Sequence, residues 1–318
     1  MTQIDWQPDV LTGFDNHQWR LGASTVEGEP DVALTATLVR AQPQRSKVAV
    51  LYVHGWNDYF FQTHLAEFFQ SVGYDFYALD LRRYGRNLQP GLYAGYVTDM
   101  AEYGEEISYA LDVIKADHDS VVLMGHSTGG LTVSLWAGRN PGAISGLILN
   151  APWLDMHGSF PWAAAQSVLT PIIKVTPTKA VTKTGLQLTR MATHVSGHGE
   201  WEYNTDWKGT PAFVGRYGWM NAILNAQAEV AKGLSIDVPI LALMSSRSVL
   251  SPTWSDDLME VDFVLDVDKL AAAATRLGNH LSLVRFPGAM HDVFLSKQPV
   301  RDRVFADMDK WLATYLAG

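Results

Sequence analysis

The residues of this chain best suited to chemistry form the segment Gly125-His126-Ser127-Thr128-Gly129. Four apolar residues precede it, and apolar residues at helical spacing follow it. In a tight turn from a strand to a helix, glycines two residues before and after the serine remove side chains that would clash. Such a turn strains its central residue and exposes the hydroxyl at the edge of the sheet. Ser127 is therefore the candidate nucleophile.

A serine hydroxyl is a poor nucleophile at neutral pH and needs a base, for which histidine is best suited. The chain has ten histidines, and His291 is the candidate because it lies in a Pro-Gly turn directly after a strand-like segment. His126 is adjacent to Ser127, so its side chain is expected to point elsewhere. His194 and His198 share an i, i+4 spacing, but no third ligand is apparent, so no metal site is expected.

The third catalytic group is a carboxylate that orients the histidine, and two aspartates compete for this role. The positions directly after the strand-like segment 239–244 carry no acid, and a long loop follows. Asp262 is favoured because it precedes Phe-Val-Leu, an apolar stretch that can anchor it inward. Asp266 is the runner-up, since it stands near an expected helix start, where an N-cap explains an aspartate.

An oxyanion that forms on a carbonyl substrate needs hydrogen-bond donors that are fixed in advance. The backbone N–H of Thr128, at the start of a helix, is one expected donor. The backbone N–H of Trp56, in the loop after an apolar strand, is the other. We place His54, Trp56, Trp153 and Trp162 at the substrate pocket, and His54 is expected to organise its loop rather than act as a base.

The elements that position these residues alternate between strands and helices. Residues 1–47 read as an antiparallel lead-in, and the short apolar runs that follow are typical of parallel strands buried on both faces. The expected strands are 32–40, 48–53, 74–79, 120–124, 143–150, 239–244 and 281–286, and the expected helices are 58–72, 98–115, 127–139, 266–277 and 298–316. This order predicts an α/β fold with a mostly parallel sheet, helices on both faces and ligands bound at the carboxyl ends of the strands.

The alternation breaks off between residues 152 and 238. This segment has no clean strand, contains several prolines and holds five of the eleven tryptophans. We interpret it as an inserted, mostly helical cap. The core is then made of residues 1–151 and 239–318.

Composition excludes several classes of function. The net charge of −9 and the lack of a strong Lys/Arg cluster argue against nucleic-acid binding. The absence of cysteine excludes disulfides, thiolate catalysis and cysteine-bound zinc. The first ten residues do not resemble a signal peptide, and no apolar run reaches the roughly 18–20 residues of a transmembrane segment, so a cytoplasmic location is expected.

Taken together, these motifs resemble the α/β-hydrolase superfamily, and within it the monoacylglycerol lipase/lysophospholipase-like group. The resemblance covers nearly the whole chain and rests on His54-Gly55, the loop from Asp80 to Arg86, the GHSxGG-like elbow at 125–130, Asp262-Phe-Val-Leu-Asp266 and Gly288-Ala289-Met290-His291-Asp292. It implies an α/β-hydrolase fold with an inserted cap, and it supports Asp262 as the acid. One departure is that this group usually has a short G-x-x-D turn where this chain has a long loop.

The leading hypothesis is a serine hydrolase that cleaves carboxylic esters through an acyl-enzyme, without a cofactor. The aromatic cap favours an apolar acyl chain, as in a lipase, lysophospholipase or carboxylesterase. The negative net charge favours a soluble or neutral-lipid ester over an anionic membrane. Thioesterase, peptidase and carbon–carbon hydrolase activities use the same residues and stay open. A non-catalytic receptor and a cofactor-free oxygenase or perhydrolase are weaker alternatives, and no oligomeric state is predicted.

Overall fold

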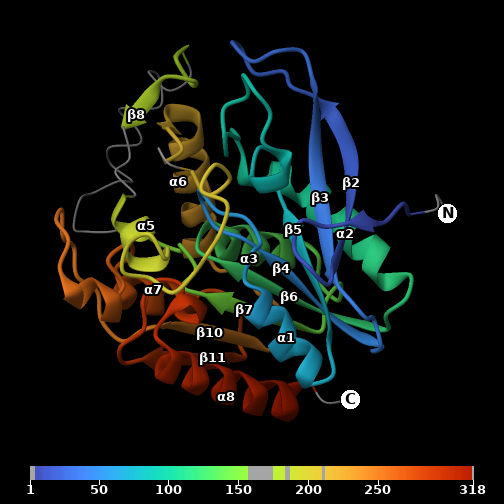
Figure 1. Cartoon of the computed structure of the whole chain (residues 1–318), viewed down its shortest axis with the longest axis vertical. Coiled ribbons are helices and arrows are strands. Elements are labelled where there is room, and N and C mark those ends of the chain that lie inside the picture. The colour runs from blue at the N-terminus through green and yellow to red at the C-terminus, as the bar shows by residue number, and fades with distance from the viewer. Residues whose placement is uncertain (1–3, 157–174, 183–186, 210–211, 317–318) are drawn as a thin grey trace.

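A twisted sheet of nine strands forms the centre of the computed structural model, which describes residues 4–156, 175–182, 187–209 and 212–316 (Figure 1). The strands are, in spatial order, β1 (Gln7–Pro8), β2 (Phe14–Ala23), β3 (Ala33–Ala41), β5 (Asp75–Asp80), β4 (Val48–Val53), β6 (Ser120–His126), β7 (Gly146–Asn150), β10 (Ile240–Ser245) and β11 (Leu281–Phe286). From β5 to β11 neighbouring strands are parallel, whereas β1, β2 and β3 join the sheet antiparallel. The mostly parallel α/β fold predicted from the sequence is confirmed.

Burial on both faces explains the apolar runs in the central strands. Every residue of β5, β7 and β10 is buried, and so are all but the first residues of β4 and β6. Residues that alternate along a strand point to opposite faces, so each strand contributes to two hydrophobic layers. Because β4, β6, β7 and β10 are parallel, their carboxyl ends lie at the same edge of the sheet, and the candidate site lies there.

Helices cover both faces of this sheet (Figure 1). The apolar sides of α1 and α8 pack on one face, and those of α2, α3, α6 and α7 pack on the other. The helices of the described residues are α1 (Thr63–Ser71), α2 (Gly104–Lys115), α3 (Thr128–Arg139), α5 (Gln187–Thr193), α6 (Tyr217–Lys232), α7 (Val267–Ala274) and α8 (Gln298–Tyr315), with short 3₁₀ turns at Gly85–Asn87, Met100–Tyr103, Asp256–Glu260 and Val293–Leu295.

Helix α1 begins at Thr63, five residues later than the sequence pattern predicts. The backbone N–H of Phe60 donates to the Asp80 carboxylate at 3.0 Å, and that of Phe61 donates to the Gln62 side chain at 3.1 Å. These bonds satisfy backbone donors outside a helix, and the chain stays a loop up to Gln62. Residues 54–62 therefore form the loop that connects β4 to α1, which we call the β4–α1 loop.

The segment between β7 and β10 contains two short strands where none was expected. Strands β8 (Ala180–Thr182) and β9 (Gly215–Arg216) pair antiparallel, apart from the central sheet. Helix α6 packs against α3, and Trp219, Ile223 and Val230 on its inner side belong to the main hydrophobic core. Much of this segment lies outside the described residues, and its division from the core at residues 152 and 238 stays a prediction.

Candidate active site

Ser127 lies in a strained turn between β6 and α3. Its φ of 52° and ψ of −116° place a non-glycine residue in backbone geometry that L-residues rarely adopt. A Cβ atom added to Gly125 would lie 2.6 Å from the Val133 side chain and 2.7 Å from the Gly129 carbonyl oxygen. One added to Gly129 would overlap the His54 carbonyl group at the end of β4. The two glycines therefore permit the tight turn that the sequence pattern predicts.

His291 and Asp262 complete a hydrogen-bonded chain with this serine. The Nε2 atom of His291 lies 3.0 Å from the Ser127 Oγ, and its Nδ1 lies 2.8 Å from the Asp262 Oδ2. The Asp262 side chain is fully buried, and its Oδ1 accepts the backbone N–H groups of Val264 and Leu265 at 2.8 and 2.7 Å. Both carboxylate oxygens are thus occupied, which fixes the direction of the His291 ring.

The runner-up aspartate has a different position. Asp266 caps α7, and its carboxylate accepts the backbone N–H groups of Asp268 and Lys269, each at 3.2 Å. This is the N-cap geometry that satisfies free donors at a helix start. The structure therefore brings Asp262 to His291 and leaves Asp266 at the helix.

The long loop after β10 folds back on itself. The Asp262 N–H donates to the Arg247 carbonyl at 3.1 Å, and the Val249 N–H donates to the Asp262 carbonyl at 3.0 Å. This pairing returns Asp262 to the carboxyl end of β10, although it is seventeen residues beyond Ser245 in the sequence. The extra residues therefore extend the loop without moving the acid away from the site.

The two expected oxyanion donors lie on either side of the serine. Thr128 is the first residue of α3, whose backbone N–H groups are directed out of the helix at this end. On the other side, a Cβ added to Gly55 would lie 3.1 Å from the Ser127 Cβ, so the β4–α1 loop lies directly against the nucleophile turn. Trp56 is the next residue in this loop. Its N–H and that of Thr128 stay predicted oxyanion donors.

A cavity of about 270 Å³ opens at Ser127 and His291. The apolar residues that line it are Trp56, Trp153, Trp219, Met220, Val264 and Leu265, and the polar ones include Asn57, Asp58, Thr189, Arg190, Tyr203 and Lys208. Trp56 and Trp153 thus line it, whereas Trp162 lies outside the described residues. Lys208 was not singled out in the sequence, and Trp219 only as one of the five tryptophans of the segment 152–238, because only folding brings them beside the β4–α1 loop.

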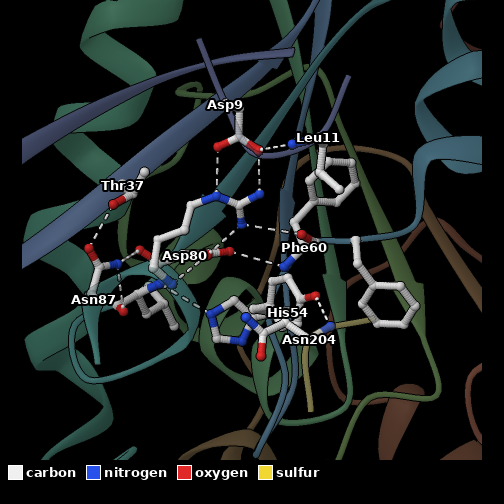
Figure 2. A network of polar contacts seen from close by, with 12 residues as sticks. Asp9, Leu11, Thr37, His54, Phe60, Asp80, Asn87 and Asn204 are labelled. Atoms are coloured by element: carbon white, nitrogen blue, oxygen red, sulfur yellow. Dashed lines mark hydrogen bonds and ion pairs between the residues drawn. The ribbon is translucent and has the colours of Figure 1, made fainter. Parts of the chain in front are cut away.

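His54 does not line this cavity, so its assignment to the pocket is wrong. Its Nδ1 donates to the Gly55 carbonyl at 2.8 Å, and its Nε2 accepts the Leu81 N–H at 3.1 Å. Figure 2 shows His54 in a network of polar contacts that also contains Asp80, Phe60 and Asn87. Both ring nitrogens are thus occupied by backbone groups, and the side chain holds this loop to the end of β5.

Asn150, the last residue of β7, connects the serine turn to the histidine loop. Its carbonyl accepts the Ser127 N–H at 3.0 Å. Its side-chain amide donates to the Asp292 carboxylate at 2.7 Å and accepts the Val293 N–H at 3.2 Å. Burial acts to raise the pKa of Asp292, but nearby His126 and the hydrogen bond from Asn150 outweigh it, so the pKa is lowered and the carboxylate stays charged.

The other histidines that the sequence raised have structural contacts. His126 is among the residues that line the cavity, although its side chain was expected to point elsewhere. Its ring centroid lies 4.9 Å from that of His291, and its Nδ1 lies 3.1 Å from the Asn150 carbonyl oxygen. His194 packs on Tyr203 and His198 stacks on Trp254. Among the residues that the structure places, no three ligand-type side chains gather in a way that would hold a metal ion.

The sheet order, the strained serine turn and the histidine and aspartate on later loops define the α/β-hydrolase class of enzymes. Within this class, residues 44–298 match the model of the Hydrolase_4 family, described as "Serine aminopeptidase, S33", and the chain belongs to this family. Within the described ranges, no helix combines the length and the apolar character needed to cross a membrane.

Individual relatives agree with this assignment. A monoacylglycerol lipase of Mycolicibacterium smegmatis is 24% identical over 274 residues, which cover 84% of this chain and 88% of that protein. A soluble variant of monoglyceride lipase from Saccharomyces cerevisiae has a TM-score of 0.65 at 19% identity, covering 93% of this chain and 95% of its own. A carboxyl esterase from Bacillus coagulans has a TM-score of 0.66 at 15% identity, covering 95% and 99%.

Proposed function

We propose that the protein hydrolyses carboxylic esters through an acyl-enzyme formed on Ser127. The observation that carries this proposal is the unbroken chain from Ser127 Oγ to His291 to Asp262, with contacts of 3.0 and 2.8 Å, whose serine and histidine line the cavity. The monoacylglycerol lipase and carboxyl esterase among the relatives support ester hydrolysis as the reaction.

In this mechanism His291 removes the proton from Ser127 as the oxygen attacks the carbonyl carbon of the ester. Asp262 holds the imidazole in the tautomer that presents Nε2 to the serine and stabilises the imidazolium that forms. The N–H groups of Trp56 and Thr128 donate to the oxyanion. His291 then gives its proton to the leaving alcohol, and a water molecule activated by the same histidine releases the acid.

The preferred substrate in this proposal is an ester with an apolar acyl chain. Three tryptophans, Trp56, Trp153 and Trp219, form one wall of the cavity, and the ring centroids of Trp56 and Trp219 lie 3.7 Å apart. Burying a chain against such a wall contributes about 25 cal/mol for each Å² of apolar surface. Described residues of the segment 152–238, among them Thr189, Tyr203 and Trp219, line the cavity at Ser127, which supports the role of this segment as a cap over the site.

Two experiments test the proposal together. A fluorophosphonate probe should label the native protein, and Ser127→Ala should abolish both this labelling and the hydrolysis of p-nitrophenyl esters. Labelling that survives Ser127→Ala would contradict the assignment of the nucleophile. A series of p-nitrophenyl esters should show kcat/KM rising with acyl length from acetate to octanoate, whereas a preference for acetate would contradict the apolar acyl subsite.

Peptide hydrolysis is the second candidate, because the description of the family names a serine aminopeptidase. An amino-acid p-nitroanilide and the p-nitrophenyl ester of the same acid differ only in the bond to be cleaved. We expect the ester to be the better substrate by kcat/KM after correction for the intrinsic reactivity of the two compounds. Faster turnover of the anilide would replace the ester proposal by the peptidase.

A further inference from the structure

Lys208 is a buried cation that the proposed mechanism does not use. Its ammonium lies 2.5 Å from the Asp58 Oδ1, and the side chains are only 10% and 3% exposed. The ammonium also lies 5.0 Å from the centre of the Phe61 ring and 5.4 Å from that of Tyr203. Burial acts to lower the pKa of Lys208, but attraction to Asp58 outweighs it and raises this pKa, so the lysine is charged at neutral pH.

The partner of this lysine belongs to the β4–α1 loop, two residues after Trp56. Neighbouring loop residues bind the same part of the chain as Asp58 does. The Asn57 side chain donates to the Gly209 carbonyl at 3.4 Å and accepts the Phe213 N–H at 3.3 Å. The Tyr59 hydroxyl accepts the Asn204 N–H at 2.8 Å. Three consecutive loop residues therefore each hold the segment between β7 and β10.

The indole of Trp56 contacts the same segment. Its ring lies 5.7 Å from Phe213, edge to face, and 3.7 Å from Trp219. Asn57, the next residue, has a φ of 54°, which asparagine tolerates better than most residues. The bonds of its side chain to Gly209 and Phe213 support this conformation. The peptide groups around Trp56 are thus oriented by contacts from outside their own loop.

Hydrogen bonds to the core hold the two ends of the loop, whereas its middle contacts the core through the rings of Trp56, against Tyr84, and Tyr59, under Arg86. His54 is bonded to Leu81 at one end, and at the other the Phe60 N–H donates to Asp80 while its carbonyl accepts from Arg86 at 3.2 Å (Figure 2). Residues 56–59 lie between these anchors. The contacts just described hold this middle part from the opposite side.

We propose that Lys208, acting through Asp58, is a positioning residue that holds the Trp56 N–H in place to stabilise the oxyanion. The segment between β7 and β10 would then take part in the chemistry itself and not only in the choice of substrate. This inference rests on the proposed function, because it requires Trp56 to be an oxyanion donor.

The test uses an ester that has no group for Lys208 to recognise. Phenyl acetate carries no hydroxyl, no nitro group and no long chain, so direct binding of such groups by the ammonium would not affect its turnover. We expect Lys208→Met to lower kcat on this ester by roughly 10- to 100-fold, below the full loss of an oxyanion donor, with KM changed less than about twofold. The octanoate ester should lose kcat to the same extent.

Two further variants separate positioning from folding. Lys208→Met leaves Asp58 buried without its partner, so the double variant Asp58→Asn/Lys208→Met removes both charges and retains the fold. It should keep the low kcat of the single variant while its melting temperature recovers toward that of the wild type. Asn57→Gly, which accepts the positive φ but lacks the two side-chain bonds, should lower kcat in the same way.

The matched control is Arg139→Met. This change removes the cation of the ion pair between Arg139 on α3 and Glu229 on α6, which also joins the core to the segment between β7 and β10. It should leave kcat unchanged.

Wild-type kcat in the double variant would overturn the inference, as would a loss confined to the octanoate ester. Failure of the native enzyme to hydrolyse either ester through Ser127 would instead refute the proposed function.

Discussion

Asp262 and Asp266 are four residues apart, but only Asp262 reaches the Nδ1 of His291. We expect Asp262→Asn to lower kcat by roughly 10⁴-fold, because an amide in this position favours the wrong histidine tautomer. Asp266→Asn should keep nearly full activity, since asparagine is also a good N-cap. Steady-state kinetics of the two variants on one ester checks the assignment. The opposite order of effects would make Asp266 the acid.

The sequence could predict Ser127 and His291 because each is surrounded by local signals, a glycine-bracketed turn and a Pro-Gly turn after a strand. Asp262 required a choice, since the position of the acid depends on how the loop after β10 folds back. Lys208 could not be found in this way. Its partner Asp58 is 150 residues away in the sequence, and no local pattern marks a contact between two such segments.

At the scale of the element, His64 ties α1 to the turn after His291. Its Nε2 lies 2.9 Å from the Phe294 carbonyl oxygen, its ring stacks on Trp201 at 4.3 Å, and its Nδ1 is buried without a partner. Burial lowers the pKa of His64 to about 4. The unfolded chain, with a histidine pKa of about 6.5, therefore binds this proton first as the pH falls.

This difference predicts a loss of stability in acid. The unfolded state binds more protons between pH 6.5 and 4, so the free energy of unfolding should decrease as the pH falls through this range, by roughly 3 kcal/mol at most. His64→Phe keeps the aromatic contact but cannot titrate, so its stability should depend less on pH. Urea denaturation at pH 7 and 4.5 measures this. His198→Gln, at an exposed position, is the control, and an equal pH dependence in His64→Phe and wild type would contradict the prediction.

Among the elements, the central strands were predicted most closely, because burial on both faces leaves an apolar run that few other structures produce. The start of α1 was predicted too early, because the periodicity of apolar residues does not indicate that the backbone N–H groups of Phe60 and Phe61 donate to side chains. The pairing of β8 with β9 was missed for a similar reason. Strands of two or three residues are too short to show an alternation of apolar and polar positions.

At the scale of the whole molecule, the antiparallel edge of the sheet is tied to the site by Arg86. The guanidinium binds Asp9, between β1 and β2, through two contacts of 2.7 and 2.8 Å, and it binds Asp80 at the end of β5 at 2.8 Å. Its third partner, the Phe60 carbonyl, belongs to the β4–α1 loop and accepts a bond of 3.2 Å. Figure 2 shows these groups as one network. The N-terminal hairpin is thereby joined to the loop beside Ser127.

We therefore expect Asp9→Asn to lower the free energy of unfolding by about 1–3 kcal/mol, because a buried guanidinium loses one of its two carboxylate partners. Urea denaturation measures the change, and Asp31→Asn at an exposed position serves as the control. A stability equal to that of the wild type in Asp9→Asn would show that this tie contributes little.

The strained backbone of Ser127 implies a trade-off between durability and activity. A residue held at a φ of 52° costs about 1–3 kcal/mol, and selection for folding alone would place glycine there. Ser127→Gly should therefore melt at a higher temperature than Ser127→Ala, since alanine removes the same hydroxyl but keeps the strain. Calorimetry of these two inactive variants would measure how much stability the enzyme gives up to present its nucleophile.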